Sequence, residues 1–436
     1  MNLSYKLFRI NSKDMNNNTN LCVKVGVVIH NFVTDSLIKY EFVMKRIIIV
    51  LIIFLKVILS FAQNYDESKV GNYRLPHLLV SENKNRVSSF TDWENIRRPE
   101  ILKLFEDNVY GMVPTYFDDI SFKVINEDNK AMDGKATLKE VDITVTRNQK
   151  TVTMHLFMFT PNNINKPVPM FLVINHRGTK TMDITRQNID GFWPAEDVIN
   201  SGYGISGFDV KDISPDNKEN FINGVLDQLY PEQLEMNNGM RALGAWGWGA
   251  SRVIDYFETD SSIDETKIIS VGHSRGGKAS LWFGAQDKRV AITISNESGN
   301  SGAALSRRNF GETVEVITKN FPHWFCPNYP QYANNEDKLP VDQHMLLALI
   351  APRAVYVASA AEDLWADPKG QYLALYEAQP TFNLYGIDTN LPVKMPEINK
   401  QIIESHLGFH NREGKHNMTP YDWQQFIKFA NIYFNR

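Results

Sequence analysis

The chain has 436 residues, of which 43% are hydrophobic and 22% are charged, and its formal net charge is −4 at pH 7. These values are typical of a globular protein and exclude a disordered chain, a collagen-like chain and a membrane protein with many spans. The slight acidic excess argues against a nucleic-acid-binding protein. Only Cys22 and Cys326 are present, so no disulfide framework is expected.

The segment that begins at Met44 has the pattern of a secretory signal. A basic pair follows Met44, Ile47–Leu55 is an unbroken apolar run, and Ser60-Phe-Ala62 supplies a small-x-small ending. A membrane span needs about 20 apolar residues, and this run is shorter and is followed by Lys56. We therefore expect a signal peptide over 44–62; an N-terminal membrane anchor is the alternative.

The limits of the exported protein follow from that signal. Residues 1–43 fit no targeting pattern and are interpreted as an extension upstream of the true start. Cleavage after Ala62 leaves one domain, 63–436, secreted or periplasmic. Because Gln63 and not a cysteine follows the cleavage site, no lipid anchor is expected, and the mature protein should lack a stable membrane anchor.

Strand and helix patterns alternate along most of the mature chain. Two runs of alternating apolar residues, 141–145 and 152–158, predict an antiparallel strand pair at a sheet edge. The continuous apolar run 170–174 predicts a strand buried on both faces; further buried runs are 268–271, 290–294 and 354–358. Helical patterns lie at 240–257, 277–286, 341–350 and from 420 onward. This alternation predicts an α/β fold in which a mostly parallel sheet is covered by helices on both faces, a three-layer sandwich.

The most informative stretch is Gly272-His-Ser-Arg-Gly276. An apolar strand precedes it and a helical pattern follows, which is the context that a G-x-S-x-G nucleophile elbow of the α/β-hydrolase fold requires. Such a sharp turn exposes the Ser274 hydroxyl and points the next backbone N–H, that of Arg275, at a developing oxyanion. A glycine-rich turn with a chance serine is the alternative.

A serine nucleophile needs a base, and in this fold the histidine comes last in the chain. His416 lies in a loop just before the final helix, where the fold places that residue; His410 competes with it. Two carboxylates compete for the acid that orients the histidine, since Glu297 follows one buried strand and Asp363 follows the next. Spacing alone leaves the choice of acid open.

With these residues in place, the chain resembles the glucuronoyl esterases of carbohydrate esterase family fifteen over roughly residues 90–436. The supporting stretches are Gly272-x-Ser-Arg-x-Gly-Lys278, Gly244-Ala-Trp-Gly-Trp-Gly249, Glu297-Ser-Gly299, Ala303-Ala-Leu-Ser-Arg307, Phe321-Pro-His-Trp-Phe-Cys326 and Glu362-Asp-Leu-Trp-Ala-Asp367. His273 stands where many members have cysteine, and Gly276 replaces an asparagine common in fungal members. These departures favour a bacterial-type member.

The resemblance implies an esterase that cleaves the bond between 4-O-methyl-glucuronic acid on xylan and lignin alcohols, without metal or cofactor. It implies Ser274 as nucleophile, His416 as base, and the Arg275 guanidinium as an added oxyanion donor. It also implies that Lys278, Glu312 and Trp365 bind the sugar acid. The alternatives are a solvated Lys278, a Glu312 paired with Arg307 or Arg308, and a Trp365 in the core.

The expected partner is glucuronoxylan or another lignin–carbohydrate ester, with no nucleic acid, and the protein is expected to be a monomer. An acetylxylan or general carboxyl esterase on the same scaffold is the competing hypothesis, because such an enzyme would not need Lys278, Glu312 and Trp365 to meet. A peptidase and a carbohydrate-binding pseudoenzyme are weaker alternatives.

Overall fold

The computed structural model describes residues 39–40, 43–49 and 63–435. The chain divides into two units, Met1–Ala62 and Gln63–Arg436. Most of the predicted signal peptide and of the predicted extension lies outside the described residues. No helix among the described residues is both long and apolar enough to cross a membrane.

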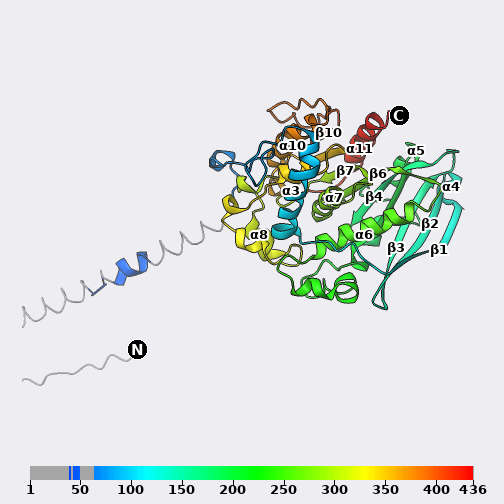
Figure 1. The fold of residues 1–436 in the computed structure, drawn as a ribbon, viewed down its shortest axis with the longest axis horizontal. Helices are drawn as coiled ribbons and strands as arrows, with labels where there is room; N and C mark the ends of the chain where they lie inside the picture. Colours follow the sequence, from blue (N-terminus) through cyan, green and yellow to red (C-terminus); the bar gives the residue numbers. More distant parts are fainter. Residues whose placement is uncertain (1–38, 41–42, 50–62, 436) are drawn as a thin grey trace, which may run out of the picture. The chain divides into compact units, whose positions relative to one another are not determined.

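The second unit is built on one mixed sheet (Figure 1). Its strands, in spatial order, are β1 (Asp119–Lys130), β2 (Ala136–Arg147), β3 (Lys150–Pro161), β5 (Gly204–Asp209), β4 (Val168–Asn175), β6 (Ile263–His273), β7 (Val290–Asn296), β8 (Ala354–Ala360), β10 (Leu407–Arg412) and β9 (Ile402–Glu404). The six strands from β5 to β10 in this order are parallel, and the flanking strands pair antiparallel.

The predicted antiparallel pair corresponds to β2 and β3, but the outermost strand on that side is β1. Strand β1 was not predicted: Ile120, Phe122 and Val124 alternate with polar residues at its start, but this alternation is short and the second half of the strand is largely polar and exposed. The short strands β5 and β10 were also not predicted, although both are fully buried.

Helices cover both faces of the sheet. They are α2 (Phe90–Asp92), α3 (Arg98–Phe105), α4 (Ala131–Gly134), α5 (Ala195–Asn200), α6 (Ala242–Phe257), α7 (Arg275–Gln286), α8 (Val314–Asn320), α9 (Gln343–Ala348), α10 (Pro368–Asn383) and α11 (Pro420–Tyr433). The predicted helices at 240–257, 277–286 and 341–350 correspond to α6, α7 and α9, with ends that differ by at most two residues.

Successive side chains of a strand point to opposite faces, so each face has its own core. In β4, Leu172 and Ile174 pack with α3, α6, α7, α9 and α10. Phe171 and Val173 of the same strand pack with α5 and α11 on the other face. The three-layer α/β architecture expected from the sequence is therefore confirmed.

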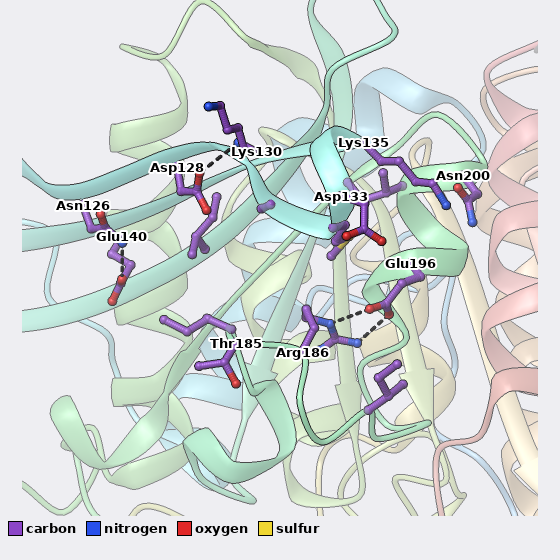
Figure 2. A pocket seen from close by; sticks show the side chains of 16 residues that line it. Asn126, Asp128, Lys130, Asp133, Lys135, Glu140, Thr185, Arg186, Glu196 and Asn200 are labelled. Carbon is purple, nitrogen blue, oxygen red and sulfur yellow. Dashed lines mark hydrogen bonds and ion pairs between the residues drawn. The ribbon is translucent and has the colours of Figure 1, made fainter.

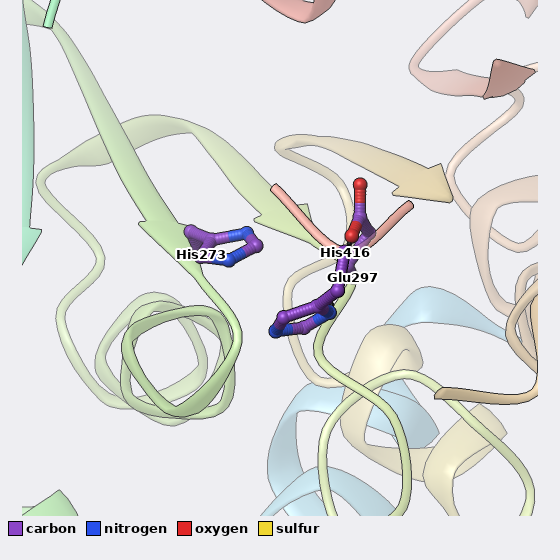
Figure 3. Close-up of side chains that lie close together, drawn as sticks. All are labelled: His273, Glu297 and His416. Atoms are coloured by element: carbon purple, nitrogen blue, oxygen red, sulfur yellow. Dashed lines mark ion pairs between the residues drawn. The ribbon is translucent and has the colours of Figure 1, made fainter. Parts of the chain in front are cut away.

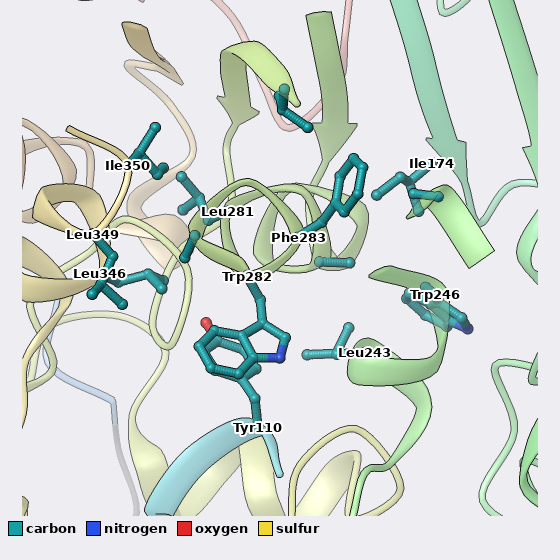
Figure 4. Packing of buried hydrophobic residues seen from close by; sticks show 14 of the residues in the cluster. Tyr110, Ile174, Leu243, Trp246, Leu281, Trp282, Phe283, Leu346, Leu349 and Ile350 are labelled. Carbon is teal, nitrogen blue, oxygen red and sulfur yellow. The ribbon is translucent and has the colours of Figure 1, made fainter. Parts of the chain in front are cut away.

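The core around α7 fixes the helix that begins at the elbow (Figure 4). Trp282 is fully buried, and its ring stacks on Tyr110 with centroids 4.8 Å apart and an interplanar angle of 14°. Loss of such a buried tryptophan costs about 3–5 kcal/mol of stability. Packing of this kind holds α7 in place against α6 and the sheet.

Candidate active site

Ser274 occupies the turn between β6 and α7 with backbone angles φ 55° and ψ −125°. A non-glycine residue adopts this region only at a cost of about 1–3 kcal/mol, and such strain is concentrated at functional sites. A methyl group on Gly272 would collide with the carbonyl of Gly276, and one on Gly276 would lie 2.8 Å from the carbonyl oxygen of Ile174. The two glycines therefore allow the close approach that the sharp turn requires.

His416 and both candidate acids lie together at the carboxyl ends of the strands. Nδ1 of His416 is 2.6 Å from Oδ2 of Asp363 and 3.1 Å from Oε2 of Glu297. Because a carboxylate only accepts, Nδ1 carries the hydrogen and Nε2 is left with its lone pair. Burial alone would lower the pKa of His416, but the hydrogen bonds and charges of Asp363 and Glu297 raise it to about 9.

The two acids differ in their surroundings. Glu297 also accepts from Nη2 of Arg412 at 2.6 Å and from the backbone N–H of Asn417 at 2.9 Å. Its carboxylate is completely buried, and burial raises its pKa to about 7 in spite of these donors. Asp363 makes the shorter contact to His416 and, among the described residues, pairs with no arginine.

His410, the competing histidine, lies in β10 and is fully buried. Its Nδ1 is 2.8 Å from the hydroxyl of Tyr356, and its Nε2 is 2.9 Å from Oδ1 of Asp422. Both ring nitrogens are thus engaged in the core beneath α11. Asp422 also accepts hydrogen bonds from the N–H and the hydroxyl of Thr419, which cap the start of that helix.

Arg275 begins α7, so its backbone N–H has no acceptor in a preceding turn of that helix. Its guanidinium lies over the rings of Phe321 and Trp324, 5.1 and 4.7 Å from their centroids. Nη1 donates to Oδ2 of Asp216 at 2.6 Å. No sequence motif pointed to Asp216, which stands in a polar loop far from the elbow in the chain.

Lys278 and Glu312 form a buried ion pair 2.8 Å long. The Lys278 ammonium also donates to the carbonyls of Ser298 and Asn300, at 2.5 and 2.6 Å, and burial lowers its pKa. Lys278 is therefore not solvated, and Glu312 pairs with Lys278 and with neither Arg307 nor Arg308. The backbone N–H of Glu312 donates to the carbonyl of Trp365, whose ring is only partly buried.

All eight predicted site residues line one cavity of about 350 Å³. They are Ser274, Arg275, Lys278, Glu297, Glu312, Asp363, Trp365 and His416, and Phe321 and Trp324 add an aromatic wall. A larger hollow of about 810 Å³ lies at the sheet edge around β1, β2 and α5 (Figure 2). Its lining includes the ion pair of Arg186 with Glu196 but none of the predicted site residues.

The segment Asn175-His-Arg-Gly178 follows β4 beside the elbow. Arg177 donates from Nη2 to Nε2 of His273 at 2.9 Å and from Nη1 to the side-chain oxygen of Asn417 at 2.7 Å. Burial and the charges of Arg275 and Arg177 lower the pKa of His176 to about 3, which leaves this imidazole neutral. The segment thus supports the loop that carries His416.

One group of metal-ligand types occurs in the described part of the chain: His273, Glu297 and His416, whose nearest ligand atoms lie within 4.8 Å of one another (Figure 3). Nε2 of His273 accepts from Arg177, so its Nδ1 carries the hydrogen and donates to Oδ1 of Asn296 at 2.6 Å. Both nitrogens of His273 are engaged, and an arginine faces one of them. The arrangement fits a hydrogen-bond network and not a metal centre.

With this geometry established, comparison with known proteins places the chain. The family model described as "Glucuronyl esterase, fungi" matches residues 143–386. The "Carbohydrate esterase MZ0003" of an unknown prokaryotic organism is 40% identical over 84% of this chain and 91% of its own length. The chain belongs to the glucuronoyl esterase family. It is a carboxylic ester hydrolase with the α/β-hydrolase fold.

Solved structures of other members of this esterase family agree. A "promiscuous CE15 esterase from the marine bacterial metagenome" is 39% identical, with a TM-score of 0.77, and the match covers 85% of this chain and 99% of that one. The "Glucuronoyl Esterase from Solibacter usitatus" is 36% identical, with a TM-score of 0.78, over 84% of this chain and all of that one. Both support the bacterial-type resemblance stated from the sequence.

Proposed function

We propose that this esterase hydrolyses esters of glucuronic acid, such as the ester that links 4-O-methyl-glucuronoxylan to lignin alcohols, through an acyl-enzyme on Ser274. The observation that carries the proposal is the convergence on one cavity of a strained serine, a histidine with two carboxylates, and a separate cluster of Lys278, Glu312 and Trp365. An ester hydrolase without a sugar-acid substrate has no need for that second cluster.

The proposed reaction has two acyl-transfer steps. Nε2 of His416 takes the proton of the Ser274 hydroxyl as Oγ attacks the ester carbonyl carbon. The bond to the alcohol oxygen then breaks, and His416 returns the proton to that oxygen. Water repeats the sequence, so that its proton passes to His416 and then to Ser274 as the free glucuronate leaves.

Arg275 is the proposed oxyanion group. Its backbone N–H stands at the position after the nucleophile, and Nη2 of its guanidinium has no hydrogen-bond partner among the described residues, while the unpartnered Nε is buried. Fixed donors aimed at a developing negative charge act strongly in a shielded site, where one donor is worth about 10²–10³ in kcat. A cation additionally compensates the charge of the tetrahedral intermediate.

Asp363 is the proposed orienting acid. It makes the shorter contact to His416, 2.6 Å against 3.1 Å for Glu297, and Glu297 shares its charge with Arg412. In this account Asp363 fixes the tautomer of His416 and stabilises the imidazolium that forms. Glu297 makes a second, longer contact to the same ring. It also accepts from the backbone N–H of Asn417, which holds the loop that carries His416.

Glu312 and Trp365 are the proposed contacts to the sugar. One oxygen of Glu312 accepts from Lys278, while the other has no donor among the described residues and can accept from a hydroxyl. The partly buried Trp365 offers a flat apolar face for the ring. Since three protein acceptors already surround the ammonium of Lys278, that residue contributes mainly by orienting Glu312.

The experiment is a comparison of three substrates on the purified protein: benzyl glucuronate, para-nitrophenyl acetate and acetylated xylan. A higher kcat/KM for benzyl glucuronate supports the proposal. A preference for the acetyl esters would contradict the substrate and favour the general carboxyl esterase, for which the promiscuous marine relative is the precedent.

Export belongs to the same proposal. The signal pattern over 44–62, with cleavage after Ala62, would deliver a monomeric domain of residues 63–436 to the periplasm or the medium. A polymeric substrate in the plant cell wall can be reached only there.

A further inference from the structure

The side chain of Asp216 is the single carboxylate that contacts the Arg275 guanidinium among the described residues. It comes from the loop between the short helical turns Val210–Asp212 and Val225–Leu229, about 60 positions before the elbow in the chain. Two further donors meet it: Nε2 of His323 at 3.0 Å on Oδ1 and Nε1 of Trp324 at 2.7 Å on the same oxygen. Oδ2 is left to Arg275, at 2.6 Å.

We propose that Asp216 is a positioning residue, which holds the Arg275 guanidinium against the aromatic wall so that its remaining donors stay at the oxyanion position beside Ser274. The inference rests on the proposed function, because it assigns to Asp216 a role that acts through Arg275. Nothing in the sequence motif around the elbow predicts it.

Rigid elements hold both sides of this contact. On one side, Nε1 of Trp246 in α6 donates to the carbonyl of Ser214 at 2.7 Å, which anchors the loop two residues before Asp216. On the other side, the carbonyls of His323 and Trp324 accept from the first backbone N–H groups of the same helix, at 3.0 and 3.4 Å. Helix α6 therefore fixes the acid and its two ring donors relative to each other.

The surroundings also keep Asp216 charged. Although burial alone would raise the pKa of its carboxyl, the donors from His323 and Trp324 and the charge of Arg275 hold that pKa well below the usual range. The guanidinium lies against the stacked rings of Phe321 and Trp324, and the carboxylate holds one of its nitrogens. An arginine held in this way loses little freedom when it binds an oxyanion, and fixed donors owe their effect to such pre-arrangement.

The test combines Asp216→Asn with Arg275→Met, singly and together, on benzyl glucuronate and para-nitrophenyl acetate. Asparagine replaces one carboxylate oxygen with an NH₂ group, which is a donor. That donor would face another donor, either Arg275 or the ring N–H groups of His323 and Trp324. We expect Asp216→Asn to lower kcat about 10-fold or more, within the ~10²–10³ that an oxyanion donor contributes, with KM unchanged. In the Arg275→Met background the same change should have no further effect, because the group through which it acts is gone.

Asp260→Asn is the matched control. Asp260 is a buried carboxylate with a similar set of donors, Lys139 at 2.7 Å and the hydroxyl of Tyr256 at 2.8 Å, but it lies at the far end of β6 from Ser274. The Asp260→Asn variant should have a lower melting temperature than the unmodified protein and the same kcat. Asp216→Glu keeps the charge and should recover part of the kcat that Asp216→Asn loses, which a purely structural role would not explain.

Two results would overturn the positioning role: an unchanged kcat in Asp216→Asn, or an equal loss of kcat with and without Arg275. Failure of the proposed function is a different result, since it would appear as hydrolysis that survives Ser274→Ala. If only para-nitrophenyl acetate is hydrolysed, the role of Asp216 is decided on that substrate by the same comparison.

Discussion

At the scale of single residues, the chemistry depends on how one imidazole is shared by two carboxylates. His416 faces Asp363 and Glu297 through the same nitrogen, and their combined effect raises its pKa to about 9. A base must be neutral to take a proton, so the fraction of competent enzyme grows as pH rises towards that value. In the proposed mechanism the same carboxylates stabilise the imidazolium of the transition state.

The pH profile of kcat/KM follows from this arrangement. We expect activity to rise with pH up to about 9 in the unmodified protein. Asp363→Asn removes a charge that stabilises the imidazolium, so it should lower the pKa of His416, move the acidic limb to lower pH and reduce the maximal rate. Steady-state rates between pH 5 and 10 measure both effects; a limb that stays in place would contradict the role of Asp363.

Glu297→Gln tests the second carboxylate in the same profile. Because its contact to His416 is longer and its charge is shared with Arg412, it should move the limb less than Asp363→Asn does. A larger shift for Glu297→Gln would make Glu297 the orienting acid.

The sugar-acid cluster gives a prediction that separates binding from chemistry. Glu312→Gln removes the charge that pairs with Lys278 and weakens an acceptor for the substrate. We expect KM for benzyl glucuronate to rise about 10-fold, a loss of roughly 1.4 kcal/mol, with little change on para-nitrophenyl acetate. Breaking the buried pair should also lower the free energy of unfolding by about 2 kcal/mol, as measured by urea denaturation.

Glu397→Gln is the control for that change. Glu397 pairs with Lys400 on the surface, where both side chains are about 70% exposed. Exposed pairs contribute about 0–1 kcal/mol, so stability and KM should both stay near the unmodified values. An equal rise of KM on both esters for Glu312→Gln would contradict a role in sugar recognition.

At the scale of elements, the elbow depends on how closely β6 and α7 approach each other. Gly272→Ala places a methyl group against the carbonyl of Gly276. The atoms that it would meet belong to the backbone of Gly276 and Gly277, so no side chain can move aside to make room. We expect a loss of about 3 kcal/mol, at the upper end of the cost of overpacking, and a loss of turnover as Ser274 moves. Urea denaturation and the initial rate measure the two effects.

Gly71→Ala is the comparison for that prediction. A methyl group at Gly71 meets no atom within 4 Å, so stability should change by less than about 0.5 kcal/mol and turnover should stay. If Gly272→Ala behaved like Gly71→Ala, the close packing of the elbow would not be needed for its function.

At the scale of the whole molecule, the parts that the sequence predicted are those in which local pattern and tertiary environment agree. Strands β4, β7 and β8 and the second half of β6 are buried on both faces, so their stretches are mainly apolar and easy to recognise. The exposed edge strand β1 and the short β10 carry no such pattern. The sequence also predicted that the proposed catalytic residues Ser274, Asp363 and His416 would lie close together, because each of them follows a strand of the sheet.

Other contacts were beyond prediction because they join segments far apart in the chain. Asp216 meets Arg275 across 59 positions, and Arg412 meets Glu297 across 115. Asp216 lies in an ordinary polar stretch and Arg412 ends the unpredicted strand β10, so only the folded chain brings them to Arg275 and Glu297. The sequence also left the choice between Glu297 and Asp363 open, because the residues that follow β7 and β8 can both contact His416.

The central claim is that this protein cleaves glucuronate esters through Ser274. The most direct measurement is the release of benzyl alcohol from benzyl glucuronate by the unmodified protein and by Ser274→Ala, with circular dichroism to compare their folding. We predict turnover by the unmodified protein and none by the folded Ser274→Ala variant. Equal turnover by both, or no turnover of this ester by the unmodified protein, would contradict the account.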